Sequence, residues 1–174
     1  MRHDNALSPF APMMVQGEGG MRIFTVFLAI CLAAPLWAQP AVWQAEWPNT
    51  DFSQSDIDFA SVMSGGPPRD GIPALDSPDM LAVGDETRLE PNEPVITVSL
   101  DGTPARAYPL RYLTWHEIVN DEMAGIPIAV TFCPLCNSAI TFDRRVADRV
   151  LSFGVSGKLR NSDMIMYDRE TESW

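Results

Sequence analysis

Two cysteines separated by two residues, Cys133 and Cys136, form the most reactive pattern in this sequence. Thiols at this spacing can close into a small disulfide, exchange disulfides with another protein, or bind a soft metal ion as thiolates. The sequence therefore predicts a thiol centre at this pair. Four interpretations stay open at this level: a metal site, a redox dithiol, a structural disulfide and a nucleophilic cysteine.

The metal interpretation needs ligands beyond the two thiolates. Copper or zinc could be bound with His116, or with a thioether from Met164 or Met166. A closed zinc site has four ligands, and the sequence contains no second Cys-x-x-Cys motif. A protein without any metal or other cofactor is an equally open alternative. His116 is not part of a zincin motif, because Asn120 occupies the position where a second histidine is required.

The other three interpretations have their own requirements. In a redox-active protein, Cys133 and Cys136 would be the catalytic residues, and a helix N-terminus would favour the attacking thiolate. The residues after the pair favour a strand instead. A structural disulfide is common in exported proteins. A nucleophilic cysteine would need His116 beside it as a base. Whether the protein is an enzyme therefore stays open.

A polar segment at residues 156–163 is the second candidate site. It is not a phosphate-binding loop, because Ser152 and Leu159 stand where that motif requires glycine and a hydroxyl residue. Either an anionic ligand or an internal salt-bridge network would explain its composition. The candidate ligand-binding residues are Ser156, Lys158, Arg160, Asn161 and Asp163.

The N-terminal region predicts export. Residues 21–38 resemble a secretory signal peptide, with an apolar run at 23–34 that is too short to span a bilayer. Residues 1–20 are expected to be a mis-assigned start or a leader, and residues 39–55 a flexible lead-in. Cleavage after residue 38 would remove Cys31 and leave no transmembrane helix. We therefore expect an extracytoplasmic protein, either periplasmic or secreted.

Composition restricts the class of partner. The 174 residues carry a net charge of −11, which argues against nucleic acid because phosphate binding needs a cationic surface. A hydrophobic fraction of 46% is enough for one domain with its own core. A small ligand, a metal ion or a periplasmic protein is the expected partner.

Hydrophobic periodicity predicts an α+β fold with a predominantly antiparallel sheet and one or two short helices. Asp101 and Gly102 indicate the turn of a β-hairpin, and Thr114 with Glu117 indicates the start of a helix. The expected strands are residues 95–100, 103–108, 126–132, 137–145, 150–155 and 164–168. The expected helices are 115–123 and a short one beginning at 78–82, and the expected loops are 64–73 and 156–163.

From about residue 56 onward, the chain resembles a bacterial and archaeal family known as domain of unknown function 3179. The motifs that carry the resemblance are VTFCPLCNSA at 130–139, FGVSGKLRNSD at 153–163, YDRETESW at 167–174, GGPP at 65–68 and WHEIVND at 115–121. The likeness covers about residues 56–174. Family members continue past the position of Trp174, so the resemblance implies the N-terminal part of a longer domain. The family has no established activity, and the resemblance implies no mechanism.

Overall fold

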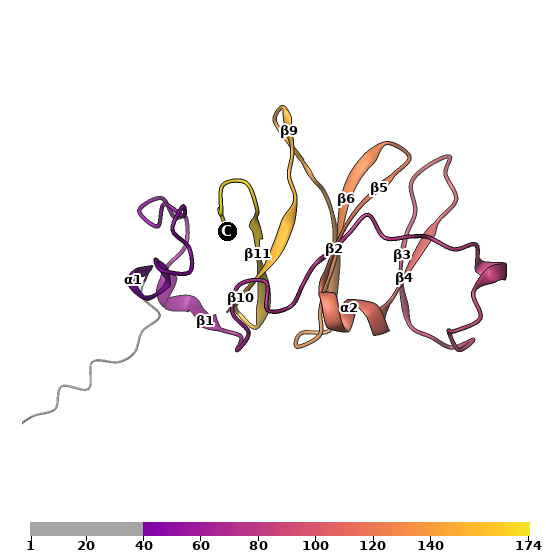
Figure 1. Ribbon diagram of the computed structural model, residues 1–174, viewed down its shortest axis with the longest axis horizontal. Helices are drawn as coiled ribbons and strands as arrows, with labels where there is room; N and C mark the ends of the chain where they lie inside the picture. Colours follow the sequence, from indigo (N-terminus) through magenta and orange to yellow (C-terminus); the bar gives the residue numbers. More distant parts are fainter. Residues whose placement is uncertain (1–39) are drawn as a thin grey trace, which may run out of the picture. The chain divides into compact units, whose positions relative to one another are not determined.

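The computed structural model describes residues 40–174, which form four small β-sheets with two short α-helices (Figure 1). The predicted α+β class, predominantly antiparallel, is confirmed. The proposed leader, the signal peptide and Cys31 lie outside the described residues. The elements are α1 (Pro40–Trp43), β1 (Val62–Ser64), β2 (Leu75–Asp76), β3 (Val95–Val98), β4 (Arg106–Pro109), α2 (Leu110–His116), β5 (Ile118–Met123), β6 (Ile126–Cys133), β7 (Ser138–Asp143), β8 (Arg145–Val146), β9 (Arg149–Val150), β10 (Phe153–Arg160) and β11 (Asp163–Asp168), with 3-10 turns at Phe59–Ser61 and Val83–Asp85.

Two sheets matter for the candidate site. We call the first the β6 sheet, with strand order β2-β5-β6-β7, and the second the β10 sheet, with order β1-β10-β11. All pairings in them are antiparallel except that of β2 with β5. Strands β3 and β4 form one separate hairpin, and β8 and β9 form another. Strands β7 and β11 are therefore sheet edges.

The prediction of a helix at residues 115–123 is wrong. Helix α2 ends at His116, and Glu117 leaves the helical conformation with a φ of 57°. Residues 118–123 form β5, which pairs with β6 through a two-residue turn at Ala124 and Gly125, both at positive φ. Turns of this kind match the twist of a hairpin. Pairing with a strongly apolar strand therefore outweighed the local capping pattern, and Thr114 bonds back to the Leu110 carbonyl inside α2 instead of capping it.

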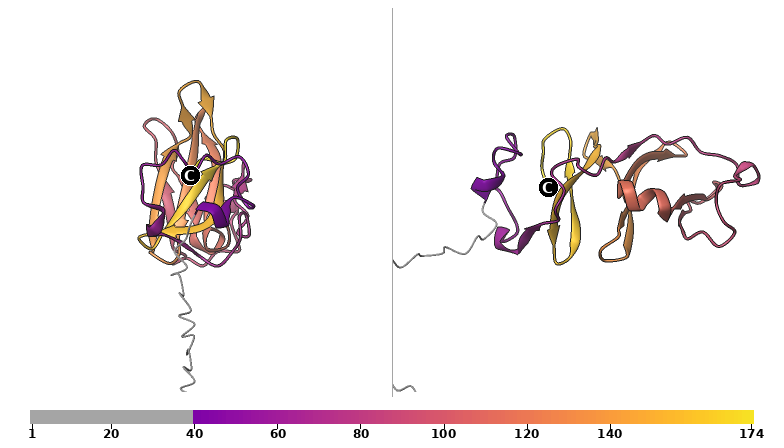
Figure 2. Two further views of the ribbon diagram at one scale, coloured as in Figure 1. Left: turned by 90° about the vertical axis from the view of Figure 1, so that its left-hand side faces the viewer. Right: turned by 60° about the horizontal axis from the view of Figure 1, so that its bottom comes forward.

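The first hydrophobic core lies on one face of the β6 sheet. Alternation along β5 and β6 places Val119, Met123, Ile128 and Val130 on this face, where they pack with residues of the β3–β4 hairpin and α2. Figure 2 shows α2 lying beside these strands. The predicted hairpin around Gly102 is confirmed, although its strands are shorter than expected and the turn at residues 100–103 lies inside a seven-residue loop.

The prediction of a polar loop at residues 156–163 is also wrong. Residues up to Arg160 continue β10, and only Asn161 and Ser162 form the turn to β11. The β-ladder is interrupted between Val155 and Leu159, where Gly157 adopts a φ of +70°. A β-bulge of this kind interrupts the regular alternation of side chains between the two faces of a strand. The polar residues around it therefore do not show the usual strand pattern in the sequence. The expected strand at 164–168 is confirmed, whereas the strand expected at 150–155 is divided between β9 and β10.

The remaining expectations concern the first half of the described chain. Residues 65–73 form an irregular loop after β1, as their glycine and proline content predicted. The short helix expected from residue 78 is replaced by the 3-10 turn Val83–Asp85. In the segment before β1, Trp43 and Trp47 are buried and pack with Val62 of β1 and Tyr167 of β11.

These two tryptophans belong to a second core, the aromatic cluster. Trp47 is fully buried and makes edge-to-face contacts with Tyr167 of β11 and with Trp174. The cluster as a whole consists of Trp43, Trp47, Phe52, Ile57, Phe59, Val62, Ile165, Tyr167 and Trp174. It occupies one face of β11, which leaves Met164 and Met166 on the other face.

Candidate functional site

The cysteine pair lies at the tip of the β6–β7 hairpin. Cys133 is the last residue of β6 and pairs with Ser138, the first residue of β7. Residues 134–137 form the loop between them, with Asn137 at a φ of 50°. Proline and asparagine suit such a loop because proline presets its own φ and asparagine tolerates the left-handed region. The turn therefore brings Cys136 back over Cys133.

Strand alternation decides which way Cys133 faces. Val130 and Phe132 point into the first core, so Thr131 and Cys133 point to the opposite face of the β6 sheet. That face is turned toward the β10 sheet. Asn120 of β5 links the two sheets, because its side chain donates to the Phe153 carbonyl and accepts from the Phe153 N–H at 2.8 and 2.9 Å.

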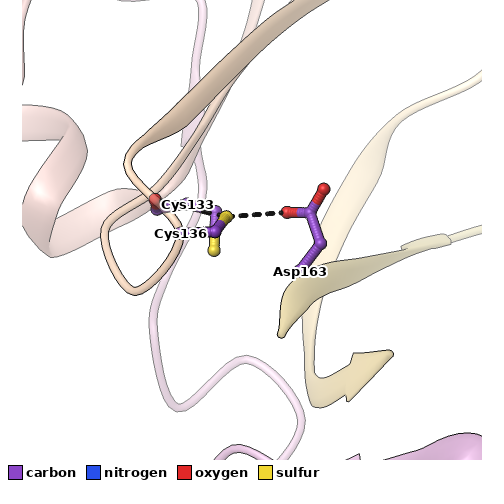
Figure 3. Close-up of side chains that lie close together, drawn as sticks. All are labelled: Cys133, Cys136 and Asp163. Atoms are coloured by element: carbon purple, nitrogen blue, oxygen red, sulfur yellow. Dashed lines mark hydrogen bonds between the residues drawn. The ribbon is translucent and has the colours of Figure 1, made fainter. Parts of the chain in front are cut away.

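This arrangement brings Asp163 to the cysteines. Asp163 is the first residue of β11, and its carboxylate points toward Cys136 across the gap between the two sheets (Figure 3). The Cys136 thiol donates to Asp163 Oδ1 at 3.2 Å. One donor atom from each of Cys133, Cys136 and Asp163 lies within 4.8 Å of the other two. We call these three residues the thiol cluster.

The electrostatics of the cluster keep Cys133 protonated. Cys133 is only 3% exposed, and burial raises the pKa of its thiol to about 11, with a further contribution from its hydrogen bond with Cys136. Cys136 is half-buried, and its sulfur lies 2.9 Å from the Ser138 hydroxyl. Both cysteines are free thiols in this structure. No helix N-terminus stabilises a thiolate here, because the pair belongs to a β-hairpin.

A small cavity of about 50 Å³ adjoins Cys133 between the two sheets. It is lined by Thr131, Cys133, Ser138, Ile140, Phe142, Asp163, Met164 and Met166. Ile140 and Phe142 belong to the edge strand β7, and both side chains remain exposed, Ile140 by 50%. The cavity therefore combines one thiol, two thioethers and a carboxylate beside a partly open apolar wall.

His116 lies elsewhere. At the end of α2, its Nδ1 is 2.7 Å from the Pro73 carbonyl oxygen. A carbonyl only accepts hydrogen bonds, so Nδ1 carries the proton in this contact. The histidine thus holds the glycine- and proline-rich loop to the helix. The third residue beside the two cysteines is Asp163, and not His116 as the sequence predicts.

The other four residues of the predicted ligand-binding segment lie along β10 and in the turn after it, away from the cysteines. Ser156 and Lys158 are buried, and Lys158 Nζ forms an ion pair with Glu46 Oε2 at 2.9 Å. Arg160 donates to the Ser61 hydroxyl at 3.1 Å, and Asn161 occupies the exposed hairpin turn. Of the five residues, only Asp163 joins the cysteines. For Lys158, the contacts support the internal salt-bridge network.

That network ties the N-terminal segment to the β10 sheet. Glu46 accepts from the Arg69 backbone N–H at 2.5 Å, and the Arg69 guanidinium bonds Glu172 at 2.6 Å. The guanidinium also lies over the adjoining rings of Trp47 and Tyr167, 4.7 and 4.6 Å from their centroids. Burial alone would raise the pKa of Glu46, but its hydrogen bonds from Lys158 and Arg69 hold that pKa below its usual value.

The family follows from a comparison of the sequence with known families. The profile of a family described as "Protein of unknown function (DUF3179)" matches residues 69–174. The chain belongs to this family. The DUF3179 match includes every member of the thiol cluster and begins after the GGPP motif at 65–68. Comparison with curated proteins and with solved structures gives no match. Among residues 40–174, no helix has the length and hydrophobicity needed to cross a membrane.

A groove of about 760 Å³ lies at the other core of this DUF3179 chain. It is formed by the irregular segment 78–93 together with the β3–β4 hairpin and α2. Neither the loop at 65–73 nor β10 contributes to it. No sequence motif indicates this groove, because the residues that line it are ordinary core and loop residues whose proximity depends on the path of segment 78–93.

Proposed function

We propose that this protein is an extracytoplasmic metal-binding protein that holds a thiophilic ion, copper or zinc, at the thiol cluster. The supporting observation is the convergence of the two cysteine sulfurs and the Asp163 carboxylate within 4.8 Å. Thiolates and carboxylates are ordinary zinc ligands, and thiolates are also preferred by copper(I). The extracytoplasmic location is part of the proposal and rests on the signal-like residues 21–38.

The properties of the cysteines favour metal binding over thiol–disulfide exchange. An attacking cysteine needs a populated thiolate, whereas the pKa of Cys133 is raised and the Cys136 thiol donates a hydrogen bond to the Asp163 carboxylate. A metal ion reverses this balance, because it displaces both protons and brings its own positive charge beside Asp163. The carboxylate then attracts the ion instead of opposing a thiolate.

The proposal is tested by metal titration of the reduced full-length protein without oxygen. We expect one zinc or cobalt(II) ion per chain, and sulfur-to-cobalt charge-transfer absorption in the cobalt form. Cys133→Ser and Cys136→Ser should abolish stoichiometric binding, and Asp163→Asn should weaken it. Asp148→Asn, in the exposed turn between β8 and β9, is the matched control for the lost carboxylate. A reduced wild-type protein that binds no ion, or cysteine variants that bind as well as wild type, would contradict the proposal.

A second candidate, a binding module with a structural disulfide, is supported by the 760 Å³ groove. Large apolar pockets with a few polar groups are typical ligand sites, and this groove combines Leu75, Met80 and Leu113 with Arg106 and Tyr108. The Cys133→Ser, Cys136→Ser double variant distinguishes the two functions. A binding module would lose stability and keep its ligand, whereas a metal-binding protein would lose its ion.

A further inference from the structure

Two methionines of β11 line the cavity beside Cys133, and the proposed function does not yet use them. Met164 and Met166 are two residues apart in a strand, so they share one face. Their neighbours Ile165 and Tyr167 pack into the aromatic cluster on the other face. The two methionines consequently lie on the face of β11 that is turned toward the β6 sheet, where they line the same cavity as Cys133 and Ser138.

We infer that Met164 and Met166 supply thioether ligands to the thiol cluster and that the resident ion is therefore copper(I). This inference rests on the proposed function, since the cysteines must bind a metal first. Copper(I) is a soft ion that prefers thiolate and thioether sulfur to carboxylate oxygen. In the copper form, Cys133, Cys136 and at least one methionine provide the donors, and Asp163 supplies negative charge beside them.

The position of Met164 supports this role. It follows Asp163 directly, and its backbone N–H donates to Asp163 Oδ1 at 2.9 Å. Figure 3 shows that β11 begins at this point, opposite the hairpin tip that carries both cysteines. The start of β11 thus brings the carboxylate and the first thioether to the same cavity. Methionine has a flexible side chain, so its sulfur can adjust to an ion without movement of the strand.

Packing is the alternative explanation for the two methionines. Met often fills irregular gaps in a core, and Leu replaces it there at little cost because the volumes are similar. Both methionines are half-buried beside exposed residues of β7. A packing role predicts that Met→Leu substitutions leave metal binding unchanged, so this substitution separates the two explanations.

The test compares two metals on the same variants of the full-length reduced protein. Copper(I) affinity is measured by competition with a chromophoric chelator, and zinc affinity by competition with a zinc indicator. In the Met164→Leu, Met166→Leu double variant we expect copper(I) affinity to fall at least about tenfold and zinc affinity to stay unchanged. A loss of this size is typical when a metal site loses residues that support it. Asp163→Asn should show the opposite pattern, with the larger loss for zinc. Met63→Leu, an exposed methionine of β1 in the same sheet, is the matched control.

X-ray absorption of the copper-loaded protein gives an independent readout. We expect three or more sulfur neighbours around copper in the wild type and about two in the double variant. Unchanged copper(I) affinity in the double variant, or a two-sulfur shell in the wild type, would overturn the inference and leave a cysteine–aspartate metal site intact. Failure of the wild type to bind either metal would instead overturn the proposed function.

Discussion

The unequal environments of the two cysteines predict a measurable difference in reactivity. In the folded, metal-free protein, Cys133 should react with a disulfide reagent more slowly than it does in the unfolded chain. Burial raises its pKa from 9.0 to about 11, which lowers its thiolate fraction near pH 8 about a hundredfold, because each pH unit changes that fraction tenfold.

The lower thiolate fraction of Cys133 is partly offset by the higher nucleophilicity of its thiolate. A more basic thiolate attacks faster, with a Brønsted slope of about 0.4–0.5, so the same pKa change increases the intrinsic rate roughly eightfold. The net effect of the pKa is a reaction about tenfold slower. With only 3% of Cys133 exposed, steric exclusion slows the reaction further. Cys136 is half-buried at the same tip, and we expect it to be modified first.

Site-resolved mass spectrometry after brief exposure to a pyridyl disulfide reagent measures both rates. The protein is assayed folded and in urea, and each cysteine is compared with itself so that local sequence effects cancel. Because Cys133 stays largely protonated below about pH 11, its folded-state rate should rise about tenfold per pH unit between pH 7 and 9. Equal folded and unfolded rates for Cys133 would refute its assigned environment. A folded protein in which neither cysteine reacts would mean that the thiol cluster is inaccessible, and the proposed function would fail with it.

Four further outcomes are expected. Metal binding should release about two protons per ion, one from each thiol, which titration in buffers of different ionisation enthalpy would measure; no release would mean that the thiols are not the ligands. Gly157→Ala should cost more than about 1 kcal/mol in urea unfolding, because the added Cβ would lie 2.1 Å from the Pro67 oxygen at a φ of +70°, whereas the control Gly84→Ala has open space. Glu46→Gln should destabilise the protein by about 2–3 kcal/mol, since it leaves the Lys158 ammonium buried without a counter-charge. Because folding lowers the pKa of Glu46, its contribution to stability should be complete above its ordinary pKa of 4.5 and lost as the pH falls through the lowered value, and the Gln variant should lack this dependence.

Some elements of the fold were predictable because their signal is local. Residues 126–132 are a continuous apolar run and form a buried strand, and Gly102 lies in the turn of a hairpin as expected. The loop at 65–73 follows from its glycine and proline content. In these segments, backbone preference and tertiary packing favour the same conformation, so the sequence pattern is enough.

Two elements were predicted wrongly because long-range pairing overrode a local pattern. Thr114 and Glu117 have the spacing of a helix cap, yet residues 118–123 gain more by pairing with the apolar strand β6. Residues 156–160 are polar enough for a loop, yet they pair with β1 and β11. Lys158 is accommodated in that strand only because Glu46, 112 residues earlier in the chain, neutralises it.

The residue pattern alone establishes a cysteine pair at the end of a strand and a resemblance to the DUF3179 family. Which residue joins the pair depends on how the strands and sheets pack. His116 and Asp163 are each many residues away from the cysteines in the sequence, and nothing local distinguishes them as partners. The two-residue turn at Asn161 and Ser162 and the Asn120 link between the sheets bring Asp163 to the hairpin tip, whereas the end of α2 directs His116 to Pro73. Side chains become neighbours through strand register and sheet packing, and both depend on contacts distant in sequence.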